Sequence, residues 1–404
     1  MVSLGFDLKF GDLYERSGLE KVDLEFVGWL SEAHPELGEA LAAARRAPDS
    51  LDTKAESDLI LALAPHVDDF IARLFGIEAQ AAALAAEHHA LAPLYVCKRM
   101  FVQRRAVKQY RGKLDELTTD AMAQVEATLS PHLEVNIASP GGELAFARLV
   151  GEWQINEDAH TDGLEAAAAY AAWATLSKQG RDRHGNGILF KNPGKVDPEN
   201  LLEAKVGSVD SPGTAVEAWA YSGDQLRRRN GFGLTDTGCG LDKALDQANY
   251  CIFCHNQGKD SCSKGLREKP TSPDQAAPFK KSHFGVTLSG CPLEEKISEM
   301  HTAKAQGLSL AALSIIVADN PMVAATGHRI CNDCMKACIF QRQEPVDIPE
   351  VETRTLKDVL ALPWGFEIYS LLTRWSPMDF NRPIPKAATG KRVLVAGTGP
   401  AGFS

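Results

Sequence analysis

The sequence predicts a mainly α-helical fold, and three observations carry this prediction. Apolar residues recur at three- and four-residue spacing through residues 12–128, as they do on the buried face of a helix. A second helical stretch follows the Pro-Gly-Gly turn at residues 140–142. A third occupies residues 293–319, which contain few helix breakers apart from Gly307. We therefore expect several helices of moderate length.

The composition is that of a soluble globular protein long enough for two or three domains: 404 residues, 44% hydrophobic and 24% charged. The net charge of −10 argues against general nucleic-acid binding, which depends on Lys and Arg neutralising phosphates. Residues 1–18 carry acidic residues among apolar ones, so they do not form a signal peptide. The longest apolar runs cover about half of the roughly 20 residues that a membrane-spanning helix needs. We expect a cytoplasmic protein that binds neither nucleic acid nor membrane.

Residues 1–235 form the first expected domain, a helical one of unknown role. Pro48, Pro65 and Pro131 mark expected breaks between its helices, because proline denies the helix a hydrogen-bond donor and disfavours helix in the residue before it. Gly112 marks another break. Further along, the Asp-Ser-Pro sequence at residues 210–212 is typical of a helix start with proline at the first position.

A basic stretch at residues 97–113 interleaves Lys and Arg with apolar residues, which indicates a basic amphipathic helix. A solvated helix face is the usual role of such a stretch, and it suits an acidic chain. The functional alternative is a docking face for an acidic partner or a nucleic acid. The cations are Lys98, Arg99, Arg104, Arg105, Lys108, Arg111 and Lys113.

Most of the cysteines fall within residues 251–338, where short spacings such as C-x2-C let neighbouring thiolates converge on one metal centre. In a reducing compartment such a cluster is more often metal-binding or redox-active than disulfide-bonded. Three cysteines on each side of a Cys-Pro step fit two cubane iron–sulfur clusters more economically than zinc. Structural zinc, free thiols, and c-type haem attachment at residues 251–255 are the alternatives. The candidate ligands are Cys251, Cys254, Cys262, Cys291, Cys331, Cys334 and Cys338.

A dinucleotide-binding motif is expected at residues 391–404. Residues 391–396 are typical of a buried parallel strand, and Gly397, Gly399 and Gly402 follow it. Glycines at these positions permit a tight turn and let backbone N–H groups approach a pyrophosphate. The sequence therefore predicts the truncated first strand and turn of a Rossmann-type FAD domain.

The cysteines, with the glycine motif some fifty residues later, resemble the helical iron–sulfur domain that precedes the flavin domain in the glutamate synthase small subunit and dihydropyrimidine dehydrogenase family. This resemblance implies an α-helical ferredoxin-like domain with two 4Fe–4S clusters. It places Cys251, Cys254 and Cys262 in one cluster, which Cys338 completes. It places Cys291, Cys331 and Cys334 in the other. The candidates for the missing eighth ligand are Cys239, Gln341 and Gln343.

The resemblance also implies how the chain is divided and what it does. The expected parts are the helical domain at 1–235, the two-cluster domain at 236–345, a helix and Pro-rich linker at 346–390, and the start of the FAD domain at 391–404. The function expected is electron transfer within an FAD-dependent NAD(P)H oxidoreductase, with FAD bound only in the full-length protein and a partner subunit or domain as electron acceptor. No residue is expected to act as a general acid or base. The alternative is a non-catalytic helical interaction protein with structural zinc sites.

Overall fold

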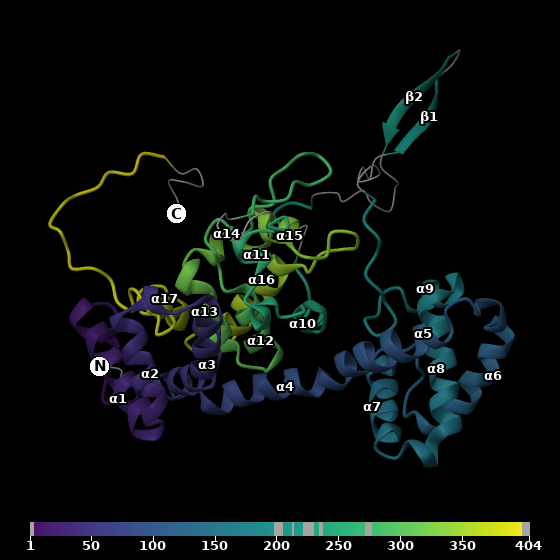
Figure 1. Ribbon diagram of the computed structural model, residues 1–404, viewed down its shortest axis with the longest axis horizontal. Helices are drawn as coiled ribbons and strands as arrows, with labels where there is room; N and C mark the ends of the chain where they lie inside the picture. Colours follow the sequence, from purple (N-terminus) through teal and green to yellow (C-terminus); the bar gives the residue numbers. More distant parts are fainter. Residues whose placement is uncertain are drawn as a thin grey trace.

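The computed structural model describes residues 4–197, 205–211, 214–220, 230–233, 237–270 and 277–397. Over these residues the protein is mainly α-helical, which confirms the predicted fold class, and its named strands form a single two-stranded sheet. Figure 1 shows a larger body, a smaller helical lobe, and a long helix that runs between them. Among the described helices, none is both long and apolar enough to span a bilayer.

The chain begins with α1 (Arg16–Ala33), α2 (Pro35–Arg46) and α3 (Thr53–Phe75), preceded by the 3-10 turn η1 (Phe10–Leu13). The expected break at Pro48 is confirmed, because a 3-10 turn separates α2 from α3 there. The expected break at Pro65 is wrong, since α3 continues through it. Proline inside a helix costs about 3 kcal/mol. The neighbouring Leu63 and Val67 are fully buried, and burial of two such side chains offsets that cost.

A continuous helical rod leads from the body to the lobe along the lower edge of Figure 1. It consists of α4 (Glu78–Val96), the π-helical η3 (Cys97–Ala106) and α5 (Val107–Gln109). The rod ends close to Gly112, whose φ of +85° is easy for glycine and confirms the expected break. The lobe adds α6 (Thr119–Leu129), α7 (Gly142–Ile155), α8 (Thr161–Leu176) and α9 (Lys178–His184).

An antiparallel hairpin replaces the helix expected at residues 210–212. Its strands are β1 (Lys205–Ser211) and β2 (Thr214–Ala220), with Lys205 opposite Ala220 and Ser211 opposite Thr214. The helix prediction was wrong because it relied on the single Asp-Ser-Pro signal. Both flanking segments contain valines, which favour strands, and a Pro-Gly pair of the kind common in turns stands between them in the sequence.

The cysteine region is built from short helices, as expected. Gly307, at φ +82°, separates two helices over residues 293–319. The elements are α10 (Leu241–Tyr250), η8 (Cys254–Gln257), α11 (Ser261–Lys264), α12 (Ile297–Ala305), α13 (Ser309–Asp319), α14 (Val323–Ile330), α15 (Asp333–Ala337), α16 (Ile348–Leu360) and α17 (Gly365–Leu372).

The apolar cores do not follow the domain boundary expected at residue 235. One core joins residues 8–77 to residues 300–380. Within it, Phe26 lies edge-on to Phe70 and Trp375 with ring centroids 5.2 and 5.9 Å apart. A second core belongs to residues 94–190, with Leu245 added from α10. Because the long rod carries the chain out of the first core and into the second, the first 77 residues pack with the far end of the chain.

The strand expected at residues 391–396 is not formed within the described part of the chain. Val393 and Leu394 are 85% and 91% exposed, and the segment carrying them reaches away from the body in yellow in Figure 1. An apolar strand of this kind is stable when neighbouring strands and helices cover both of its faces. The described residues offer no such sheet at this place.

Candidate functional site

The structure brings four of the predicted cysteines together around one small cavity. Cys251 ends α10, Cys254 begins η8, Cys262 lies in α11, and Cys338 follows α15. The cavity has a volume of about 20 Å³, and its remaining walls are mostly apolar. Cys262 donates from its Sγ to Asp260 Oδ1 at 2.9 Å. A space of this size holds about one water molecule.

The surroundings of this cavity keep its thiols protonated. Burial raises the pKa of Cys251 to about 12 and the pKa of Cys254 to about 11. His301 also lines the cavity and is fully buried, and neither of its ring nitrogens has a hydrogen-bond partner among the described residues. Burial lowers the pKa of His301 to about 3. The histidine is therefore neutral, and the site carries little charge at neutral pH.

The other three predicted cysteines do not gather in the same way. Cys334 is buried near Cys291 and two carboxyl groups, and burial raises its pKa above the ordinary range of a thiol. Cys331 is exposed. Among the described residues, no three or more His, Cys, Asp or Glu side chains are grouped so that they could hold a metal ion. In this arrangement the cysteines do not fit a cubane cluster.

The three candidates for an eighth ligand lie elsewhere. The backbone N–H of Cys239 donates to Glu350 Oε2 at 3.0 Å. The side-chain amide of Gln341 donates to the carbonyl of Lys336 at 2.8 Å. Gln343 donates to the hydroxyl of Tyr250. Each of them is therefore engaged in a contact away from the thiol-lined cavity.

The glycines expected to bind a dinucleotide cannot be compared with a nucleotide-binding turn. Gly397 adopts φ +121° at the end of the exposed segment. Gly399 and Gly402 lie outside the described residues.

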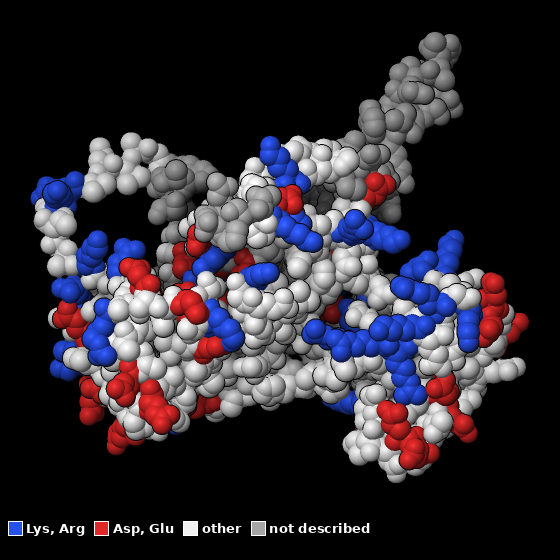
Figure 2. All heavy atoms as spheres, viewed as in Figure 1, with Lys and Arg blue, Asp and Glu red and all other residues white. Residues whose placement is uncertain are grey.

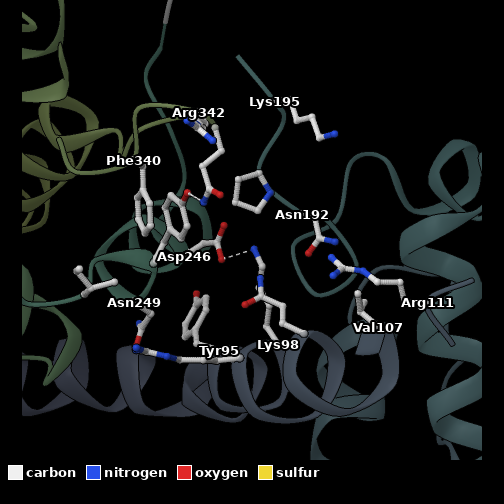
Figure 3. Close-up of a pocket in the computed structure, with 16 residues that line it drawn as sticks. Tyr95, Lys98, Val107, Arg111, Asn192, Lys195, Asp246, Asn249, Phe340 and Arg342 are labelled. Atoms are coloured by element: carbon white, nitrogen blue, oxygen red, sulfur yellow. Dashed lines mark hydrogen bonds and ion pairs between the residues drawn. The ribbon is translucent and has the colours of Figure 1, made fainter. Parts of the chain in front are cut away.

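A much larger cavity, of about 830 Å³, lies between the helical rod and the cysteine region (Figure 3). We call it the basic cleft. The rod forms one wall, α10 and residues 340–343 form another, and residues 192–195 close a third side. The lining residues are Tyr95, Lys98, Arg99, Gln103, Val107, Arg111, Asn192, Pro193, Lys195, Asp246, Asn249, Tyr250, Ile252, Phe340, Arg342 and Gln343.

Positive charge dominates the basic cleft. Asp246 is the one carboxylate that lines it, and Lys98 Nζ binds Asp246 Oδ1 at 2.6 Å. The other cations, Arg99, Arg111, Lys195 and Arg342, form no ion pair with any described residue. Figure 2 shows Lys and Arg side chains gathered on this face of the molecule, between the body and the lobe. The cleft therefore has an excess of unpaired cations.

The π-helical stretch places side chains toward the basic cleft. In a π-helix the backbone hydrogen bonds run from residue i to residue i+5, which brings Lys98 and Gln103 onto one face. Both of these residues line the cleft. Long π-helical stretches are rare, and π-helical turns are frequent at functional sites.

The wall next to the cysteine region is aromatic. Tyr250 and Phe340 stack with ring centroids 4.5 Å apart and an interplanar angle of 12°. Phe340 and Ile252 line both the basic cleft and the thiol-lined cavity. These two side chains therefore separate the two spaces.

The comparisons with known proteins begin at the N-terminal helices. Residues 4–76 match the family model described as the RP005 N-terminal alpha-helical domain. The uncharacterized protein RP005 of Rickettsia prowazekii is 33% identical over 315 residues, which make up 76% of this chain and all of that protein. The chain belongs to the RP005 family. In this RP005 family member the matched residues include α1–α3, which pack into the first core.

A second relative shares a shorter piece. The uncharacterized protein RP006 of the same organism is 61% identical over 83 residues, 20% of this chain but 12% of that protein. No solved structure matches this RP005 family member.

These findings correct the resemblance drawn from the cysteines and glycines. The family shown is RP005, and neither the family model nor the two relatives point to glutamate synthase or dihydropyrimidine dehydrogenase. The description as a metal-binding, iron–sulfur oxidoreductase is wrong for the same reason, and because no metal-holding group is present among the described residues. The resemblance rested on spacing within one short region, while similarity to RP005 covers most of the chain. Electron relay, FAD and NAD(P)H are tested by none of these findings.

The sequence gave only one signal of the basic cleft, the basic stretch at residues 97–113. Three of its cations, Lys98, Arg99 and Arg111, line the cleft. The preference for a simple solvated face missed this role, because the other walls come from segments far away in the sequence.

Proposed function

We propose that this RP005 family member is a non-catalytic binding protein that holds an anionic ligand in the basic cleft. The observation that carries the proposal is the set of four cations, Arg99, Arg111, Lys195 and Arg342, that face one cavity without an ion-pair partner among the described residues. The volume of the cleft, about 830 Å³, lies within the range of small-molecule sites.

The overall charge makes this concentration of cations informative. In a chain of net charge −10, unpaired cations around one cavity are not a by-product of a basic surface. Clefts lined by one sign of charge focus the field and raise the local concentration of oppositely charged ligands. Guanidinium groups bind carboxylates and phosphates through two parallel hydrogen bonds, which favours Arg99, Arg111 and Arg342 as anion contacts.

Binding of simple anions to the purified chain tests this proposal. Two probes, a fluorescein-labelled octaglutamate peptide and inorganic tripolyphosphate, would be measured at low and at physiological salt. We expect at least one of them to bind, with affinity falling as salt rises. Loss of one cation near a bound anion costs roughly 1 kcal/mol, or about fivefold in affinity, even at the dielectric constant of water. The double variant Arg99→Gln with Arg111→Gln should therefore weaken binding by at least about twentyfold.

A matched control comes from the same helical rod. Arg104 and Lys108 are exposed on it and do not line the cleft. The double variant Arg104→Gln with Lys108→Gln makes the same change in net charge and should alter affinity less than twofold. Equal weakening by both double variants would show that the anion responds to overall charge, and the proposed site would be wrong. The same conclusion would follow if neither probe bound.

We further propose the division of the chain at residues 235, 345 and 390 and a cytoplasmic location. A small core around Cys251, Cys262, Cys334 and Cys338 supports a unit centred on the cysteine region. The nine cysteines are free thiols, which suits a reducing compartment. Proteolysis at the proposed boundaries, followed by mass spectrometry of the resistant pieces, tests the division.

A further inference from the structure

We propose that the ligand of the basic cleft is a nucleoside polyphosphate, with its base on the Phe340 ring and its phosphates among the arginines. This inference rests on the proposed function, because it assumes that the cleft holds an anion. It goes further by naming the class of ligand from the chemistry of the different walls.

The first step is the aromatic wall. Phe340 and Tyr250 form a stacked pair, which presents a flat ring to the cleft. Hydrogen bonds hold this pair in place: the Tyr250 hydroxyl donates to the Glu344 carbonyl at 3.0 Å, and the Gln343 amide donates to the same hydroxyl. A fixed flat ring is a stacking platform for a planar heterocycle. A polyglutamate segment or an inorganic phosphate has no part that could use it.

The second step is the set of side-chain amides beside this wall. Asn249 donates its amide N–H to the Leu245 carbonyl at 2.8 Å, which leaves its carbonyl oxygen to accept. Asn192 and Gln103 line the cleft with no hydrogen-bond partner among the described residues. Amides that both donate and accept match the edges of a nucleobase. A ligand with charge alone would not need them.

The third step is the separation of cations from the aromatic wall. In Figure 3, Arg111 extends from the lobe side toward Asn192, across the cavity from Phe340. Lys98 lies between them and binds Asp246. The cavity thus has a flat apolar end and a basic end. A nucleoside polyphosphate has the same division, with a planar base at one end and a negatively charged chain at the other.

The test compares ATP, inorganic tripolyphosphate and octaglutamate on the full chain by isothermal titration calorimetry. We expect ATP to bind at least about tenfold more tightly than tripolyphosphate, as one base–aromatic stacking contact provides. Phe340→Ala should reduce ATP affinity about tenfold and leave tripolyphosphate affinity unchanged. Arg111→Gln should weaken both ligands.

The neighbouring residue supplies a matched control for the aromatic wall. Ile339 lines the thiol-lined cavity and not the basic cleft, so Ile339→Ala should leave ATP affinity within twofold of wild type. Since Phe340 also packs against the cysteine region, saturation-transfer NMR on the wild-type chain gives an independent readout. The adenine protons should receive more saturation than the ribose protons.

The possible outcomes separate the two proposals. Equal affinities for ATP and tripolyphosphate, or strongest saturation on the ribose, would overturn the nucleotide inference and leave the anion site standing. Binding of octaglutamate alone would also overturn it, in favour of an acidic protein segment. If none of the three ligands bound, both proposals would fail.

Discussion

Asp358→Asn is expected to destabilise the protein strongly, because it isolates a buried lysine. Lys304 is fully buried in α12 and forms an ion pair with Asp358 of α16. Asp358 also accepts from Arg354 Nε at 2.7 Å, and His88 of α4 lies 3.9 Å away. Asparagine keeps the shape of the side chain and removes the charge. The ammonium group of Lys304 would then be left in the core with Arg354 as its nearest charged neighbour.

The expected cost follows from the ways in which Lys304 can respond. Breaking a buried ion pair by removing one partner costs about 3–5 kcal/mol. Burial already lowers the pKa of Lys304, so the lysine can instead lose its proton. Deprotonation at pH 7 of a lysine with an unfolded pKa near 10.4 costs about 4.6 kcal/mol, at about 1.4 kcal/mol per pH unit. We therefore expect a loss of about 3–5 kcal/mol at pH 7, which shrinks by up to about 1.4 kcal/mol for each unit of rising pH.

Urea unfolding monitored by circular dichroism at pH 7, 8 and 9 measures this cost. Lys304→Met is the matched variant, since it removes the cation and leaves Asp358 paired with Arg354, and we expect it to lose about 1–3 kcal/mol. The double variant Lys304→Met with Asp358→Asn should be more stable than Asp358→Asn alone. A loss below about 1 kcal/mol for Asp358→Asn, or a double variant less stable than that single one, would refute the buried pair.

Three further predictions concern other parts of the chain. Burial raises the pKa of Asp68 to about 6, so its ionised form costs stability above that pH; the wild type should gain about 3 kcal/mol of unfolding free energy from this group between pH 7 and pH 4, and urea unfolding of Asp68→Asn should lack that gain. Gly307→Ala should lose about 1–2 kcal/mol in thermal melts, because φ is +82° and the new Cβ would lie 3.3 Å from Ala85 Cα, whereas Gly151→Ala, with open space inside α7, should gain up to about 1 kcal/mol. The exposed Cys331 should react first with Ellman's reagent, and Cys331→Ser should remove that fast phase; a fast phase that persisted would contradict the described exposure.

The local structure could be read from the sequence wherever one local signal dominated. Helical periodicity and the glycines at 112 and 307 gave the helices and several of their ends correctly. Pro65 was misjudged because the burial of Leu63 and Val67 outweighs a local penalty, and burial depends on residues distant in the chain. The hairpin at residues 205–220 was missed for a related reason, since a single helix-start signal was weighed without the strand preference on both sides.

The candidate site could be predicted only in part. Close spacing in the sequence brought Cys251 and Cys254 into one cavity, and the convergence of Cys262 and Cys338 on it was expected from a resemblance that the family comparison corrects. The basic cleft draws its walls from residues 95–111, 192–195, 246–252 and 340–343. No periodicity or spacing connects these segments. Their meeting depends on how the helical rod crosses between the two large cores.

Phe340 and Ile252 form a partition one side chain thick between a wet, charged chamber and a nearly dry one lined with thiols. Close-packed interiors transmit small displacements, so a molecule that presses on the cleft side of this partition also changes the other side. The reaction rate of the enclosed thiols should therefore report on whether the larger chamber is filled. The protein would thus carry its own internal indicator of occupancy, at a place where no external label needs to be attached.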